Sequence, residues 1–77
     1  MKVTLFTKTD CGLCRQAEEA LRRLGKEIPF ELEFVDIEDD PELHNRYWDR
    51  VPVVALQGTE VAAAPLDEGR LRAVLKA

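Results

Sequence analysis

The feature that most constrains this chain is a pair of cysteines, Cys11 and Cys14, placed where one kind of secondary structure gives way to another. They are the only cysteines in the 77 residues. The short apolar run Val3–Phe6 precedes them and predicts a buried central strand. From Cys11 onward the spacing predicts an amphipathic helix, whose apolar side would hold Leu13, Ala17, Ala20, Leu21 and Leu24. Two thiols at such a junction can form and break a disulfide without rearranging a fold.

The rest of the chain predicts an α/β order of β-α-β-α-β-β-α. The predicted elements after the first helix, which should end near Gly25, are a strand over 30–37, a helix over 42–47 that begins at Asp40-Pro41, strands over 52–56 and 60–64 joined by a turn at 57–59, and a last helix capped by Asp67 with Leu66, Leu71, Val74 and Leu75 as its apolar face. The first strand pair should be parallel with a right-handed crossover, and the last pair should be an antiparallel hairpin.

Length and composition indicate one domain spanning residues 1–77. The net charge of −4, with acidic residues spread along the chain, argues against a nucleic-acid partner. No apolar run reaches the ~20 residues of a membrane span, and Val3–Phe6 is too short for the core of a signal peptide. We therefore expect a cytoplasmic monomer without a membrane partner. In that reducing compartment the cysteine pair is expected to be catalytic or metal-binding.

The position of Cys11 at the start of a helix bears on its chemistry. The nucleophile in disulfide exchange is the thiolate, and unpaired N–H groups at a helix start favour an anion. That effect, up to about 2 kcal/mol, would lower the pKa of Cys11 by roughly one unit. Lys8 should lower this pKa further, whereas Asp10 should raise it.

The two thiols should differ in role. Cys14 lies one helical turn further in, so its sulfur should be less exposed and close enough to attack a mixed disulfide at Cys11. Cys11 would then attack and Cys14 would resolve. Gly12 leaves the backbone open to an approaching substrate, and Leu13 would present an apolar tip beside the reactive sulfur.

Two other interpretations of the cysteine pair remain at this point. A C-x-x-C can be half of a zinc site, but tetrahedral zinc needs four ligands and only His44 offers a good third. The thiols could also be two inert core residues. We expect no metal.

Beyond the cysteines, the chain resembles glutaredoxins over nearly its whole length. The resemblance rests on the N-terminal strand, on Cys11-Gly12-Leu13-Cys14 opening a helix, on Asp40-Pro41-Glu42-Leu43, on Val51-Pro52 before a hairpin, and on the short final helix. It is nearest to the small bacterial glutaredoxin-like proteins. It implies a thioredoxin-like fold with a four-stranded mixed sheet flanked by helices. It also implies a cis Pro52, which would expose the Val51 backbone to an extended substrate segment.

The resemblance implies a dithiol oxidoreductase that reduces protein or glutathione mixed disulfides. No cofactor would be required, and the oxidised pair would be reduced by glutathione or by a donor of the thioredoxin-reductase type. Lys8 and Arg50 could bind the carboxylates of glutathione. The Gly-Gly of the usual glutathione site is absent after the fourth strand. Asp67 could contact a γ-glutamyl group there or simply cap the last helix.

Other functions are open as well. Some glutaredoxins with glycine after the first cysteine hold an iron–sulfur cluster between two subunits, and Gly12 permits this by resemblance. A redox-silent adaptor that keeps the fold for partner binding is a further alternative. Tyr47 and Trp48 are expected to pack in the core or at its rim.

Overall fold

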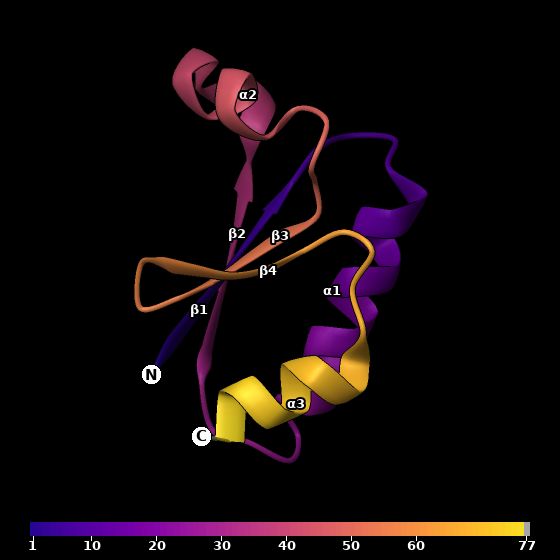
Figure 1. Cartoon of the computed structure of the whole chain (residues 1–77), viewed down its shortest axis with the longest axis vertical. Coiled ribbons are helices and arrows are strands. Elements are labelled where there is room, and N and C mark those ends of the chain that lie inside the picture. The colour runs from indigo at the N-terminus through magenta and orange to yellow at the C-terminus, as the bar shows by residue number, and fades with distance from the viewer. Residues whose placement is uncertain (77) are drawn as a thin grey trace.

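The sheet is built around the first strand. The computed structural model describes residues 1–76 and has the strand order β2-β1-β3-β4 (Figure 1). The strands are β1 (Lys2–Thr7), β2 (Glu31–Asp36), β3 (Val53–Leu56) and β4 (Thr59–Ala63). β1 pairs with β2 in parallel and with β3 antiparallel, and β3 pairs antiparallel with β4. The predicted strand order in the chain and the predicted mixed sheet are therefore confirmed.

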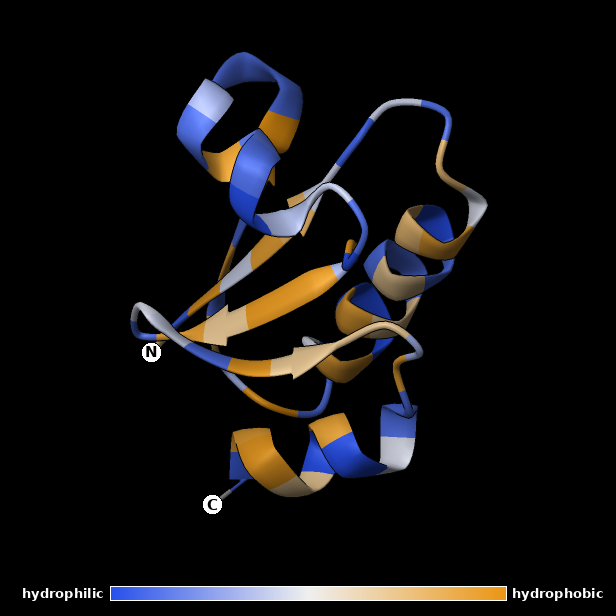
Figure 2. Ribbon diagram, turned by 45° about the horizontal axis from the view of Figure 1, so that its top comes forward, coloured by the Kyte–Doolittle hydropathy of each residue, from blue (hydrophilic) through white to orange (hydrophobic). Residues whose placement is uncertain are grey.

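Three α-helices pack around this sheet: α1 (Gly12–Leu24), α2 (Pro41–Tyr47) and α3 (Glu68–Lys76), with a short 3₁₀ turn over Ile37–Asp39 before α2. The main core joins one face of the sheet to α1 and α3; its buried residues are Val3, Leu5, Ala17, Leu21, Leu24, Ile28, Val54, Leu71 and Leu75. On the other face, Phe6 and Val53 pack with Tyr47 of α2. Figure 2 shows apolar segments along the strands and helices that mix polar and apolar residues.

The helix that follows β1 differs from its prediction at one position. Leu13, predicted on the apolar side, has 54% of its surface exposed. Cys14 takes a buried position in its place, so the stripe that faces inward begins at Cys14 and continues through Ala17, Leu21 and Leu24. The reason is that Cys14 packs with Ile37, Tyr47 and Val51 outside the main core, whereas Leu13 belongs to neither buried cluster.

Element ends are set by caps that the sequence predicts. The Asp40 carboxylate accepts a hydrogen bond from the Glu42 N–H at 2.9 Å, and Pro41 is the first residue of α2. Asp67 caps α3 in the same way, accepting from the Arg70 N–H at 3.2 Å.

Several predicted strand boundaries move by one residue. Phe30 and Pro52 precede their strands, Ile37 begins the 3₁₀ turn, and β4 runs one residue earlier than predicted. The residues of this strand alternate between apolar and polar from Phe30 to Phe34, but Phe34 is 39% exposed at this edge of the sheet. Among residues 1–76 no helix is both long and apolar enough to cross a membrane.

Candidate active site

Cys11 occupies the N-cap of α1, where an extended backbone turns into the helix (φ −115°, ψ 109°). Its sulfur accepts a hydrogen bond from the Cys14 N–H at 3.2 Å. This contact is the usual N-cap arrangement, with sulfur in the place of the common oxygen. The Cys11 thiol is partly exposed, so a substrate can reach it.

Cys14 lies one turn further along and only 3% of its surface is exposed. It packs in an apolar cluster separate from the main core, together with Ile37, Tyr47 and Val51. Burial raises the pKa of the Cys14 thiol, and its contact with Cys11 adds to that rise. The Thr7 hydroxyl and the Lys8 backbone oppose it by favouring the thiolate. The structure thus gives the pair the unequal exposure that the sequence predicted.

A small polar hollow opens beside the two sulfurs. It has a volume of about 230 Å³ and is lined by Thr7, Lys8, Asp10, Cys11, Cys14, Arg15 and Glu18. Lys8 therefore does lie beside the thiols, as proposed from the sequence, but together with the carboxylates of Asp10 and Glu18. The mixed charge of this hollow does not by itself select an anionic ligand.

A second cavity, of about 280 Å³, lies on the side of α1 that faces Pro52. Its lining residues are Leu13, Gln16, Ala17, Ala20, Arg23, Pro52, Ala64, Pro65, Leu66, Glu68 and Leu71. It therefore brings the exposed Leu13 and the residue before β3 into one groove beside the cysteine pair. Nothing lies within 4 Å of the position that a Cβ on Gly12 would take, so the backbone next to Cys11 is open.

The Val51–Pro52 segment is packed against this site. Both the Val51–Pro52 and the Ala64–Pro65 peptide bonds are cis. Val51 contacts the same apolar cluster as Cys14. Its N–H donates to the Tyr47 carbonyl at 3.1 Å, so this N–H is already engaged and does not face a substrate. The strand-like pairing that the resemblance suggested is thereby limited to the Val51 carbonyl.

The remaining predicted site residues lie apart from the thiols. Asp67 caps α3 and does not line either hollow beside the cysteines. The Arg50 guanidinium is paired with Glu60 and stacks 5.7 Å from the centre of the Tyr47 ring. His44 is on the exposed side of α2. Within residues 1–76 no group of three or more histidine, cysteine or acidic side chains is arranged to hold a metal ion.

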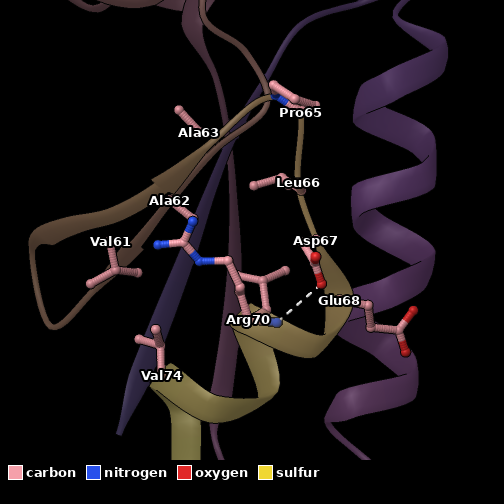
Figure 3. Close-up of a pocket in the computed structure, with 10 residues that line it drawn as sticks. Val61, Ala62, Ala63, Pro65, Leu66, Asp67, Glu68, Arg70 and Val74 are labelled. Carbon is pink, nitrogen blue, oxygen red and sulfur yellow. Dashed lines mark hydrogen bonds between the residues drawn. The ribbon is translucent and has the colours of Figure 1, made fainter.

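Sequence reasoning missed two features near the site. One is the contribution of Thr7 to the surroundings of Cys14, because it depends on how β1 ends against α1. The other is a cavity of about 740 Å³ between β4 and α3, into which Arg70 extends (Figure 3). No local sequence pattern marks Arg70, since its setting depends on where α3 lies against the sheet.

Comparison with known proteins gives consistent results. A family model described as Glutaredoxin-like domain (DUF836) matches residues 2–76. The uncharacterized protein Rv0508 of Mycobacterium tuberculosis is 35% identical over 77 residues, which cover 94% of this chain and 79% of that protein. Target protein XcR50 from X. campestris, solved by X-ray crystallography, is 40% identical with a TM-score of 0.82, over 96% of this chain and 95% of that one. Thioredoxin O2 from Arabidopsis thaliana, in the oxidized state, is 28% identical with a TM-score of 0.68, over 97% of this chain and 71% of that one. The architecture is that of thioredoxin-like folds.

Proposed function

This chain belongs to the glutaredoxin-like domain family, and we propose that it is a dithiol thiol–disulfide oxidoreductase. The observation that carries the proposal is the unequal setting of two adjacent thiols. Cys11 is partly exposed at the start of α1, whereas Cys14 is almost fully buried one turn away. A substrate can reach the first sulfur but not the second, so the attacking and resolving roles are separated by position.

The reaction transfers two electrons from the dithiol to a substrate disulfide. The Cys11 thiolate attacks one substrate sulfur, which forms a mixed disulfide and releases the other substrate sulfur as a thiol. Cys14 then loses its proton and attacks the Cys11 sulfur. The second substrate thiol leaves, and a Cys11–Cys14 disulfide remains. The two protons of the reduced protein end on the two released thiols.

Burial of Cys14 matters for this order of events. A raised pKa keeps Cys14 protonated at neutral pH, so it does not compete with Cys11 for the substrate. The hydroxyl of Thr7 and the backbone of Lys8 favour the thiolate of Cys14. Their contribution becomes useful when that thiol has to ionise in the resolving step.

Trapping of the mixed disulfide tests the proposal. The Cys14→Ser variant, mixed with a protein disulfide substrate, should accumulate a covalent adduct through Cys11 that mass spectrometry detects. The Cys11→Ser variant should form no adduct and should release no substrate thiol. Full turnover by Cys11→Ser would rule out Cys11 as the attacking thiol.

The electron donor for the oxidised protein is proposed to be glutathione or a thioredoxin-reductase-type enzyme. The groove that holds Leu13 and Pro52 could accommodate either a small thiol or an extended segment. The two donors are separated by supplying each of them alone to the oxidised protein and following the return of free thiols.

A further inference from the structure

A further cavity lies outside the two hollows described beside the thiols. It measures about 740 Å³ and is formed by β4, the loop after it and α3; its lining residues are Val61, Ala62, Ala63, Pro65, Leu66, Asp67, Glu68, Arg70, Leu71 and Val74. Most of these side chains are apolar. A volume of this size is within the range of sites that bind small ligands or a few residues of a peptide.

The charged groups of this cavity are not equivalent. Asp67 is occupied by capping α3, and Glu68 pairs with Arg23 at 2.7 Å. In Figure 3 Glu68 points away from the cavity, toward α1, whereas the Arg70 side chain reaches across it toward Ala62. Within residues 1–76 the Arg70 guanidinium has no ion pair. Arg70 therefore offers an occupant a positive charge without an ion-pair partner among the described residues, next to the Asp67 carboxylate, which keeps its negative charge while it caps α3.

The cavity also adjoins the groove lined by Leu13 and Pro52. Both are lined by Pro65, Leu66, Glu68 and Leu71. An extended chain that places a disulfide at Cys11 can thus continue past Pro52 and the loop after β4 into the larger cavity. β4 is at the edge of the sheet, and the outward backbone groups of an edge strand can pair with an added extended segment.

We propose that the groove and the adjoining cavity together select the substrate. They receive an extended protein segment that carries an acidic side chain, and Arg70 in the cavity pairs with that carboxylate. The inference rests on the proposed oxidoreductase function and names the class of disulfide that the protein reduces. The feature that distinguishes a substrate is an acidic residue at some distance from the substrate cysteine. The apolar side chains of the cavity contact the residues next to that acidic residue. Arg70 is in this account a specificity residue and takes no part in the exchange itself.

The test uses synthetic peptides in which one cysteine is joined by a disulfide to 2-mercaptoethanol. A single glutamate, or glutamine as its neutral match, is moved through the positions on either side of that cysteine. At one position the second-order rate constant for reduction should be up to about five-fold higher with glutamate, as for a solvent-accessible ion pair of about 1 kcal/mol. Arg70→Gln should abolish this difference, and Arg70→Glu should favour lysine there instead.

The matched control is Lys26→Gln, which removes the same charge from an exposed position that lines none of the cavities described. It should keep the full glutamate preference. All these variants should reduce the small neutral disulfide bis(2-hydroxyethyl) disulfide at the wild-type rate. Failure of the wild type in that reaction would contradict the oxidoreductase function and not the groove.

Binding measurements separate peptide recognition from disulfide reduction. Fluorescence anisotropy with peptides that carry serine in place of cysteine reports recognition without chemistry. The glutamate peptide should bind wild type and Lys26→Gln more tightly than Arg70→Gln by the same factor as in the rates. Equal binding and equal rates at every glutamate position, or a preference that survives Arg70→Gln, would overturn the inference.

Discussion

At Cys14 the protein keeps a thiol almost out of contact with water while its neighbour remains reachable. The difference should appear directly in reactivity. At neutral pH, brief treatment of the reduced native protein with iodoacetamide should modify Cys11 and leave Cys14 unmodified, because only the first sulfur is accessible. Peptide mapping by mass spectrometry measures the two sites. Denatured protein should be labelled at both, and equal labelling of the native protein would contradict the assigned roles.

The raised pKa of Cys14 also has a consequence for stability. At pH values below the ordinary thiol pKa of 9.0, the Cys14 thiol is neutral in both the folded and the unfolded state. Above it the unfolded chain loses this proton first, so stability falls as pH rises toward the folded pKa, by about 1.4 kcal/mol for each unit of difference.

Urea unfolding of the reduced protein at neutral pH and at about pH 10 measures this loss. The free energy of unfolding should decrease more in the wild type than in Cys14→Ala, which lacks the group. Parallel decreases in the two proteins would show that Cys14 does not carry the effect.

Single residues show where sequence reasoning succeeds and where it stops. The lower exposure of Cys14 was predictable because its place one turn into a helix follows from the chain itself. For Leu13 the sequence supported two positions, on the apolar side of the helix and as a tip beside the Cys11 sulfur, since Leu13 fits the helical spacing as well as Cys14 does; in the structure it is exposed. Which of the two faces inward depends on what packs against the first turn of α1.

At the scale of elements, the β3–β4 hairpin depends on one glycine. Gln57 and Gly58 both have positive φ, of 52° and 84°, as a two-residue turn between antiparallel strands requires. Replacing Gly58 by alanine should lower the free energy of unfolding by about 1 kcal/mol, because a Cβ disfavours this backbone region.

Gly12→Ala is the matched control for this hairpin substitution. Neither glycine has an atom within 4 Å of the added Cβ, but only Gly58 has a positive φ. Gly12→Ala, at the first residue of α1, should leave stability unchanged or raise it slightly. Thermal unfolding of both variants measures the two changes in stability. Equal losses of stability would show that the positive φ of Gly58 is not the cause.

The elements themselves were largely predictable. Local signals specify them: the continuous apolar run of β1, the Asp40-Pro41 start of α2 and the cap at Asp67. Their ends moved by a residue because pairing in the sheet, rather than local pattern, decides where a strand stops. Phe34 is exposed because β2 is an edge strand, which the alternation of its sequence does not reveal.

For the whole molecule, stability rests on a small core shared by one sheet face, α1 and α3. Leu21 is fully buried there, whereas Leu13 on the same helix is 54% exposed. Leu21→Ala should lower the free energy of unfolding by about 2–5 kcal/mol, a large share of the ~5 kcal/mol that so small a domain holds. Leu13→Ala should change it by less than about 0.5 kcal/mol. Urea titrations of the two variants compare them, and similar losses would contradict the assigned faces of α1.

The large cavity belongs to this scale as well. It exists only because α3 lies against the edge of the sheet at β4, so Arg70 acquires its setting from elements distant in the chain. No spacing rule in the sequence predicts such a site. The cysteine pair, in contrast, is a local feature at the junction of β1 with α1, although the residues that bury Cys14 (Ile37, Tyr47 and Val51) come from other elements.

A single-turnover titration of the reduced protein with a disulfide substrate tests the dithiol mechanism. Each chain should reduce one disulfide, release both substrate thiols and end with a Cys11–Cys14 disulfide that mass spectrometry identifies. Release of substrate thiols without that disulfide, or equal release by Cys11→Ser, would rule out dithiol exchange through Cys11 and Cys14.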